Sequence, residues 1–388
     1  MRISTVTEPS VWPTPGSHGR FIELPIVSLT PIYKGGARPT AIDVDRPFRV
    51  PSIRGMLRYW WRATSPHNAI EKLRDAEQEL FGGVFNDAPV ASKVTVSITE
   101  QRSKPGKRPN KPYVFGVAGA VPGTADQVHE GATGNLRLEW SDDSARVEVL
   151  RALRAWMLFG GLGGRSRRGA GSVWWEKSDH PTFPPPASVN ALIDAARKLT
   201  PPGVHLLWPT LATGAILIGP ACKGGDDAWD SGLAAMKNVR ASRDVNSKVL
   251  ERLERPADAI DWKLQDYIKF SNNEPFRTGR AALGLPIRFQ GTAGTFVLTP
   301  ALDTFNRFPS PIHFKVVRLG EKYHPIYTVL RTPMPDAKNA LKVKPDRRNG
   351  PNNSREVRGT LDRSGLDRFV DMTARLEGWL LHTLDGAQ

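Results

Sequence analysis

Short strand-like runs and longer helical segments alternate along the chain, and proline- and glycine-bearing stretches separate them. β-Branched and aromatic residues between turn residues mark the strands, and apolar residues three or four positions apart mark the helices. Because both halves of the chain show this mixture, the sequence predicts an α+β fold built from two units. The predicted strands lie at 21–31, 92–98, 214–221, 286–291, 294–300 and 312–319, and the predicted helices lie at 52–64, 66–80, 144–159 and 366–384.

Proline-rich and polar stretches predict the boundaries between these units. The chain has 388 residues, which is enough for two domains of ordinary size. We expect an extended arm at 1–20, a first domain at 21–181, and a second domain at 187–388 that follows a linker in TFPPP, 182–186. The basic segment RSKPGKRPNKP, 102–112, predicts a mobile loop, and a polar stretch at 335–358 predicts a second exposed loop.

The charge of the chain indicates the kind of partner that it binds. Lys and Arg together number 54 against 39 for Asp and Glu, which gives a formal net charge of +15. An excess of this size favours nucleic acid or another polyanion as partner. The single cysteine cannot form an internal disulfide, which agrees with a cytoplasmic location. No apolar run is long enough to cross a membrane, and the N-terminus lacks the pattern of a secretory signal.

The segment SIRGMLRYWWRA predicts a helix with one apolar face and one basic face. Ser52 follows Pro51 and is the expected N-cap. Ile53, Met56, Leu57 and Trp60 form the core face, while Arg54, Arg58 and Arg62 form a stripe at positions i, i+4 and i+8 that Trp61 flanks. Guanidinium groups about 6 Å apart match successive phosphates, and an adjacent indole can stack on an unpaired base. The alternative is a solvated arginine face with both tryptophans in the core.

The segment GGLGGRSRRGAGSV, which follows the helix at 144–159, predicts an anion-binding loop. Glycines allow backbone N–H groups to approach an anion closely, and arginines make bidentate contacts with phosphate. A P-loop and a dinucleotide fingerprint are excluded, because no Lys–Ser/Thr pair follows the glycines and the segment leads from a helix into the strand-like GSVWW. A flexible linker with incidental charge is the alternative. The candidate contacts are Gly163, Gly164, Arg165, Arg167 and Arg168.

Three features suggest catalytic chemistry, and we interpret each as structural. Asp43 and Asp45 precede the basic helix, and loop aspartates commonly cap turns. The GGDD turn at 224–227 resembles the metal-binding turn of polymerase palms, but a helix-like segment follows it, so Asp226 or Asp227 is expected to cap that helix. His18 and His67 lack an obvious Lys or Tyr partner, and one cysteine with eight scattered histidines cannot build a zinc knuckle. We expect no metal site and no cofactor.

The order of these motifs resembles that of the RAMP superfamily, the RRM-like proteins of CRISPR systems. TPIYKGG, RVPSIRGMLRYWWRA, ELFGG, SKV and GGLGGRSRRGAGSV follow one another between residues 24 and 175. The IRG-x-LR-x-WWRA helix followed by ELFG is similar to the Cmr-one family, a subunit of type III-B CRISPR effector complexes. LGLPI at 283–287 and FPSPIHFKVV at 308–317 resemble features of the family's second half.

The resemblance implies a fold, a set of partners and a set of RNA contacts. It implies two tandem ferredoxin-like (RRM-like) RAMP domains and a non-catalytic subunit that caps the complex, near the 3′ end of the guide RNA (crRNA) and the 5′ part of the single-stranded target RNA. The implied partners are these RNAs and the other effector subunits, and no membrane. Carried over by residue, the implied contacts are Lys34, Arg54, Arg58, Trp61, Arg62, Arg165, Arg167 and Arg168.

Two other functions remain open from the sequence. One is a RAMP endoribonuclease that cleaves RNA with a metal held by Asp43, because related backbone subunits use a loop aspartate in this way. The other is a structural subunit whose basic surface contacts a protein neighbour. Salt-sensitive RNA binding without cleavage distinguishes the capping subunit from both.

Overall fold

The computed structural model describes residues 20–33, 42–43, 45–85, 88–115, 127–178, 180–203, 207–240, 276–291, 294–301, 307–334, 341–345 and 357–384. Two predicted functional residues, Lys34 and His18, and the arm at 1–19 lie outside these ranges. In the ranges given, no helix is both long enough and apolar enough to span a membrane.

The first half of the chain forms an antiparallel sheet with two helices on one face. The chain runs strand–helix–strand–strand–helix–strand, and the main strands lie in the order β5, β6, β1, β7. Burial alternates along β1, so that Leu24 and Ile26 face the helices while Glu23 faces outward. The strands are β1 (Phe21–Ser28), β2 (Ile32–Tyr33, beside β6), β5 (Val94–Lys107), β6 (Gln127–Trp140) and β7 (Val173–Trp175), and the helices are α1 (Val50–Ala63), α2 (Ile70–Phe81), α3 (Pro112–Phe115) and α4 (Asp143–Phe159).

The starts of the two covering helices follow from their capping residues. The Asp142 carboxylate accepts a hydrogen bond from the Ala145 N–H at 2.9 Å, so α4 begins within one residue of its predicted start. Helix α1 begins at Val50, and Arg49 occupies the N-cap without a side-chain bond. The prediction of Ser52 as N-cap is therefore wrong. Pro51 lies inside the first helical turn, where a missing N–H costs nothing.

The second half repeats the same chain order around another antiparallel sheet. Its strands lie in the order β12, β13, β8, β16, and helices α6 and α9 contact one face. Almost every residue of β12 is buried, because α4 of the first half contacts the other face of this sheet. The elements are α5 (Val189–Leu199), β8 (Thr210–Ile218), α6 (Gly225–Arg240), β12 (Ile312–Leu319), β13 (Lys322–Arg331), α9 (Gly365–Ala374) and β16 (Leu380–Leu384).

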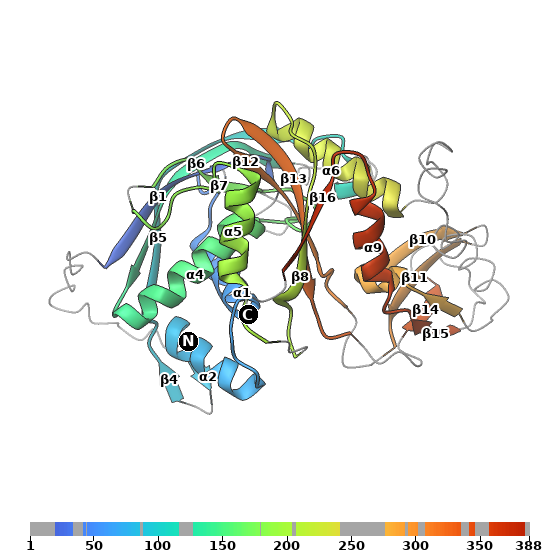
Figure 1. Cartoon of the computed structure of the whole chain (residues 1–388), viewed down its shortest axis with the longest axis horizontal. Helices are drawn as coiled ribbons and strands as arrows, with labels where there is room; N and C mark the ends of the chain where they lie inside the picture. The colour runs from blue at the N-terminus through green and yellow to red at the C-terminus, as the bar shows by residue number, and fades with distance from the viewer. Residues whose placement is uncertain are drawn as a thin grey trace, which may run out of the picture.

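Two further sheets complete the described fold. A β-hairpin follows α2, and a five-stranded sheet lies at the end of the molecule away from the first half, beyond α9 (Figure 1). In that sheet β9 runs parallel to β15, and the other pairs are antiparallel. The elements are β3 (Gly83–Phe85), β4 (Ala88–Val90), β9 (Phe276–Thr278), the 3₁₀ helix at Arg280–Leu283, β10 (Ile287–Gly291), β11 (Gly294–Pro300), β14 (Leu341–Pro345) and β15 (Val357–Leu361).

A buried lysine joins the two halves. Lys315 on β12 is 1% exposed, and its Nζ donates to the carbonyl oxygens of Trp156 and Met157, 3.4 and 2.5 Å away in the last turn of α4. The C-terminal carbonyls of a helix lack partners within the helix and carry partial negative charge, so an ammonium group is well placed there. Burial lowers the pKa of Lys315 well below its usual value.

Three segment predictions are wrong, each because distant parts of the chain decide the structure. Residues 102–107 belong to β5 and pair with β6, so only the last part of the segment 102–112 is a loop. The predicted loop at 335–358 contains β14 and the start of β15. The predicted helix at 366–384 ends at Ala374, and residues 380–384 pair with β8 instead.

Candidate nucleic-acid interface

The Gly-rich loop between α4 and β7 is held in place by backbone hydrogen bonds to the first sheet. The Gly164 N–H donates to the Tyr33 carbonyl at 2.6 Å, and the Gly171 N–H donates to the Pro31 carbonyl at 2.9 Å. These bonds exclude a flexible linker. They also use the Gly164 N–H, which we expected to face an anion.

The second half of the chain holds the other side of the same loop. The Phe314 N–H on β12 donates to the Arg167 carbonyl at 3.3 Å. The Trp229 indole on α6 donates to the Arg168 carbonyl at 2.9 Å. The loop is therefore fixed between the two halves, and its backbone positions the arginines with little freedom.

Two glycines make this close approach possible. A Cβ at Gly171, where φ is +64°, would lie 2.0 Å from the backbone oxygen of Leu162. A Cβ at Gly169, where φ is +83°, would lie 2.7 Å from the Trp229 ring and 2.9 Å from the Phe314 ring. Both positions therefore require glycine. Glycine adopts the left-handed backbone conformation without strain, and it has no Cβ to collide with the neighbouring atoms.

The arginines of the loop differ in what they contact. Arg165 is exposed at φ +64°, and its side chain makes no hydrogen bond or ion pair with the described part of the chain. Arg167 is half-buried: its Nη1 donates to the Ser310 carbonyl at 2.5 Å, and its guanidinium lies 5.4 Å from the Tyr59 ring. Arg168 is exposed, and its Nη1 donates to the Tyr113 carbonyl at 2.7 Å. Two of the three loop arginines therefore present charge to solvent.

A basic and aromatic segment, 108–115, packs beside the loop and was missed as a functional element. The Tyr33 and Phe115 rings lie 4.8 Å apart, and the Arg108 guanidinium lies 5.8 Å from the Phe115 ring. Tyr113 is half-buried under Arg168. The sequence signal for this segment is the tyrosine that directly follows RSKPGKRPNKP. We call the surface formed by the Gly-rich loop and residues 108–115 the loop crest.

Lys111 anchors the loop crest to the second half of the chain. Its Nζ lies 2.5 Å from Asp230 and 3.0 Å from Asp226, and 4.9 Å from the centre of the Trp229 ring. The ammonium group is 7% exposed, so both carboxylates neutralise it within the protein. Arg108, Arg165 and Arg168 also carry positive charge at the crest.

The predicted arginine stripe on α1 contacts helix α2 and the strands beside it. Arg54 donates to the Phe81 carbonyl at 2.8 Å and to the Val94 carbonyl at 3.2 Å. Phe81 ends α2, whose last turn contains no basic residue, so Arg54 supplies the positive charge that a helix C-terminus favours.

The other two stripe arginines share one carboxylate. Arg58 Nε lies 2.6 Å from the Glu77 carboxylate, and Arg62 Nη1 lies 2.7 Å from it. The Glu77 side chain is 10% exposed, whereas the arginine side chains are 34% and 37% exposed. The stripe is thus partly neutralised inside the molecule, and its arginines hold α2 against α1.

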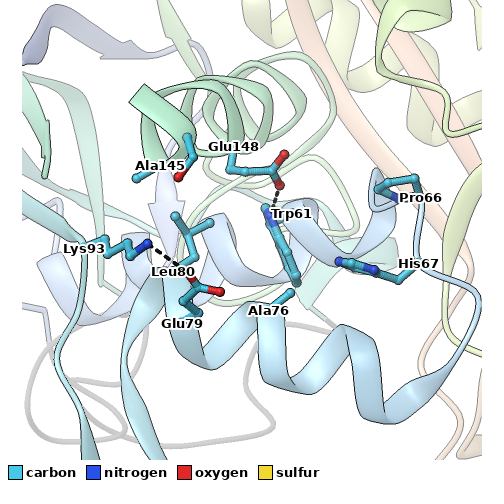
Figure 2. Close-up of a pocket in the computed structure, with 10 residues that line it drawn as sticks. Trp61, Pro66, His67, Ala76, Glu79, Leu80, Lys93, Ala145 and Glu148 are labelled. Carbon is cyan, nitrogen blue, oxygen red and sulfur yellow. Dashed lines mark hydrogen bonds and ion pairs between the residues drawn. The ribbon is translucent and has the colours of Figure 1, made fainter. Parts of the chain in front are cut away.

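The prediction that Trp61 offers a surface for base stacking is wrong. Trp61 is 1% exposed, and its indole N–H donates to Glu148 on α4 at 2.6 Å. Figure 2 shows this bond at the wall of a pocket of about 220 Å³, where His67 and Ala76 lie beside the indole. Helices α2 and α4 both cover this side of α1, so the buried arc of α1 is wider than its periodicity indicates. Trp60, at 0% exposure, lies in the core as predicted.

The residues considered for catalysis lie in ordinary structural positions. The Asp43 carbonyl accepts a hydrogen bond from Arg46, and Asp45 is exposed. The Asp43 carboxylate raises the pKa of His129, but burial lowers that pKa by more, so it ends below its usual value. Within the ranges that the structure describes, no three His, Cys, Asp or Glu side chains gather so that they could hold a metal.

The GGDD segment leads into a helix, as predicted, but the helix already begins at Gly225, so neither aspartate occupies the predicted capping position. Asp226 and Asp227 lie in the first turn of α6, where negative charge is favourable. A palm-type metal turn joins two strands, and here a helix follows the glycines, so that interpretation is excluded. His67 is half-buried beside Trp61, with the two ring centres 6.2 Å apart.

A buried pair of titratable groups lies beneath the loop crest. The Tyr59 hydroxyl on α1 lies 2.9 Å from His313 Nε2 on β12. Burial lowers the pKa of His313 well below its usual value, and the neighbouring Arg167 lowers it further. Burial raises the pKa of Tyr59. Both groups are therefore neutral at pH 7, and the pair links α1, the Gly-rich loop and the second sheet.

Comparison with known proteins identifies the first half of the chain. Residues 26–174 match the family model of the RAMP superfamily. A segment of 133 residues is 31% identical to the CRISPR system Cmr subunit Cmr1-1 of Pyrococcus furiosus. The alignment covers 32% of this chain and 39% of that relative, so it spans about two fifths of the relative's length.

Solved structures share the fold over almost the whole chain. The crystal structure of Cmr1 from Pyrococcus furiosus in its apo form superposes with a TM-score of 0.53 at 19% identity, covering 94% of this chain and 99% of that one. A chain of the cryo-EM structure of the type III-B Cmr-beta complex bound to cognate target RNA superposes with a TM-score of 0.50 at 11% identity, covering 91% and 99%. The first half of the chain thus matches the RAMP superfamily, as its motifs predict, and almost the whole chain shares the fold of Cmr1.

Proposed function

We propose that this protein is a non-catalytic, RNA-binding subunit of a type III-B CRISPR ribonucleoprotein in the cytoplasm. It caps the complex where the 3′ end of the guide RNA and the 5′ part of the target RNA lie, and it contacts other effector subunits. The observation that carries this proposal is the loop crest, where a rigid backbone presents Arg165 and Arg168 to solvent.

The chemistry of the crest suits a sugar–phosphate backbone without regard to sequence. Guanidinium groups bind phosphate oxygens in a bidentate manner, and a pre-positioned loop loses little conformational entropy on binding. The net charge of +15 adds long-range attraction for a polyanion. In such a subunit, base pairing between guide and target carries the sequence information.

The topology supports two tandem ferredoxin-like domains, with the predicted boundaries at 21–181 and 187–388. Each half runs strand–helix–strand–strand–helix–strand. Within each main sheet the four strands lie side by side in the order second, third, first, fourth. The loop crest lies where these two domains meet. Further candidate contacts are Lys34, Arg54, Arg58 and Arg62. Because Arg58 and Arg62 share the single negative charge of Glu77, the stripe keeps a net positive charge that attracts phosphate.

Titration of fluorescein-labelled single-stranded RNA with the full chain tests this function. The double variant Arg165→Ala/Arg168→Ala should weaken binding about tenfold or more, because two charge-assisted contacts disappear. The slope of log affinity against log salt should become shallower by about 1.4, which is two phosphate contacts at about 0.7 each. The control Arg146→Ala/Lys198→Ala removes the same charge from exposed positions on α4 and α5 and should leave both quantities nearly unchanged.

The same titration tests the enzymatic alternative. The RNA should stay intact with and without Mg²⁺ or Mn²⁺. Metal-dependent cleavage that disappears in Asp43→Ala would replace the proposal with the endoribonuclease. RNA binding that is absent, or equally weakened by the two double variants, would contradict the loop crest as the binding surface.

A further inference from the structure

From its position in the loop crest we infer that Tyr113 is the platform on which one RNA base stacks, with Arg168 beside the stacked nucleotide. This inference rests on the proposed function, because it names the residue that binds a base at the same surface. It also replaces Trp61, whose burial removes it from any stacking role.

Most of the aromatic side chains that the structure describes around the crest are buried, whereas Tyr113 is partly exposed. Tyr33, Phe115, Trp229 and Phe314 are 8%, 9%, 0% and 2% exposed, and each packs within the core. Tyr113 lies between the buried residues Val114 and Lys111, yet it is itself only half-buried. One part of the Tyr113 ring packs against the core, and the other part remains open to solvent.

The backbone beneath Tyr113 is fixed before any ligand binds. The N–H groups of Val114 and Phe115 donate to the Lys111 carbonyl at 2.9 and 3.1 Å, and the Lys111 ammonium is bound to α6. A ring with few rotatable bonds on a fixed backbone makes an efficient stacking surface, because little entropy is lost when a base covers it.

Arg168 gives the platform its charge. Its guanidinium lies 5.8 Å from the centre of the Tyr113 ring, and one nitrogen is tied to the Tyr113 carbonyl while the side chain remains exposed. A base on the tyrosine therefore places its phosphate within reach of a guanidinium already held in position. Combining an aromatic face with a cation is how proteins bind single strands without reading their sequence.

Fluorescence titration of the full chain with single-stranded RNA tests the inference. Tyr113→Ala should weaken binding about 5- to 100-fold, the usual range for loss of one stacked base, whereas Tyr113→Phe should retain binding within about twofold. The slope with salt should not change, because no phosphate contact is removed. Tyr323→Ala is the matched control: its ring has Arg318 at 5.9 Å, and it lies toward the opposite end of the β12–β13 hairpin from Phe314, the residue that contacts the loop.

An abasic scan of the RNA provides the second arm. With the wild-type chain, removal of one base at a single position should weaken binding as much as Tyr113→Ala does. With the Tyr113→Ala chain, the same abasic RNA should bind no worse than intact RNA. Normal binding by Tyr113→Ala, alongside weakened binding by Arg165→Ala/Arg168→Ala, would overturn the platform and leave the proposed function intact. Absence of RNA binding by the wild-type chain would contradict the proposed function itself.

Discussion

At the scale of single residues, the basic stripe of α1 shows that a pattern expected for binding can hold helices together. Glu77 is nearly buried and receives Arg58 and Arg62, so removal of either cation leaves a carboxylate with fewer partners. A buried polar group that loses a hydrogen bond costs more free energy than the bond contributes on average. Substitution of the stripe arginines should therefore lower the stability of the fold.

Arg58→Ala should therefore lower the free energy of unfolding by about 1–3 kcal/mol, even though the side chain is one third exposed. Urea unfolding followed by circular dichroism measures this change. Arg146→Ala, at an exposed position on α4, is the control and should shift the free energy by less than about 0.5 kcal/mol. Equal midpoints for the two variants would show that the bond from Arg58 to Glu77 contributes nothing to stability.

The same helix shows what a sequence can predict about single residues. The spacing of Ile53, Leu57 and Trp60 is sufficient to place them in the core, and all three are 0% exposed. Trp61 could not be placed, because it lies at the border of the apolar arc, where the position of other elements decides burial. The hydrogen bonds of Arg54 could not be predicted from the sequence either, because their acceptors, Phe81 and Val94, lie 27 and 40 positions along the chain.

At the scale of elements, the position of the Gly-rich loop was predicted correctly, but its contacts with the second half of the chain were not predicted. The loop begins after α4 and leads into β7 as expected, and it also fastens the two halves together. In contrast, β16 was predicted as helix because LEGWLLHTL has helical spacing, and pairing with β8 overrides that preference. Strand β5 was predicted to end at residue 98, because the Pro and Gly residues of the segment 102–112 indicated a loop, although an edge strand tolerates proline.

Two glycine substitutions, one in this loop and one in β6, should separate the effect of limited space from the effect of backbone conformation. Gly171→Ala and Gly131→Ala both place a Cβ at a left-handed position, with φ of +64° and +56°. Gly131 has no atom within 4 Å of the added carbon, whereas Gly171 has a backbone oxygen at 2.0 Å. We expect a loss of about 1–2 kcal/mol for Gly131→Ala from conformation alone and a clearly larger loss for Gly171→Ala. Similar thermal unfolding midpoints would show that the loop relaxes around a side chain.

At the scale of the whole molecule, the two halves are joined by buried polar groups as well as by apolar packing. Lys315 binds the end of α4, and Tyr59 binds His313 across the same junction. Such groups are favourable only in one arrangement of the halves, because a shifted junction would leave them buried without partners. The junction therefore fixes how the loop crest is presented. None of these pairs could be predicted from the sequence, since their members lie more than 150 positions apart.

This junction should make stability depend on pH through His313. Its folded pKa is well below 6.5 because of burial and the nearby Arg167, while the unfolded value is about 6.5. Below the unfolded pKa, His313 binds a proton in the unfolded chain but stays unprotonated in the folded chain. The free energy of unfolding therefore falls as the pH falls from about 7 to 5, by at most about 1.4 kcal/mol per pH unit for this group.

In His313→Gln, which keeps a polar partner for Tyr59, the decline in the free energy of unfolding should be shallower by that amount. His129, His180 and His382, whose pKa values are also lowered, stay in both proteins and cancel in the comparison. Urea unfolding at a series of pH values measures both slopes, and parallel slopes would mean that His313 is protonated within the folded junction.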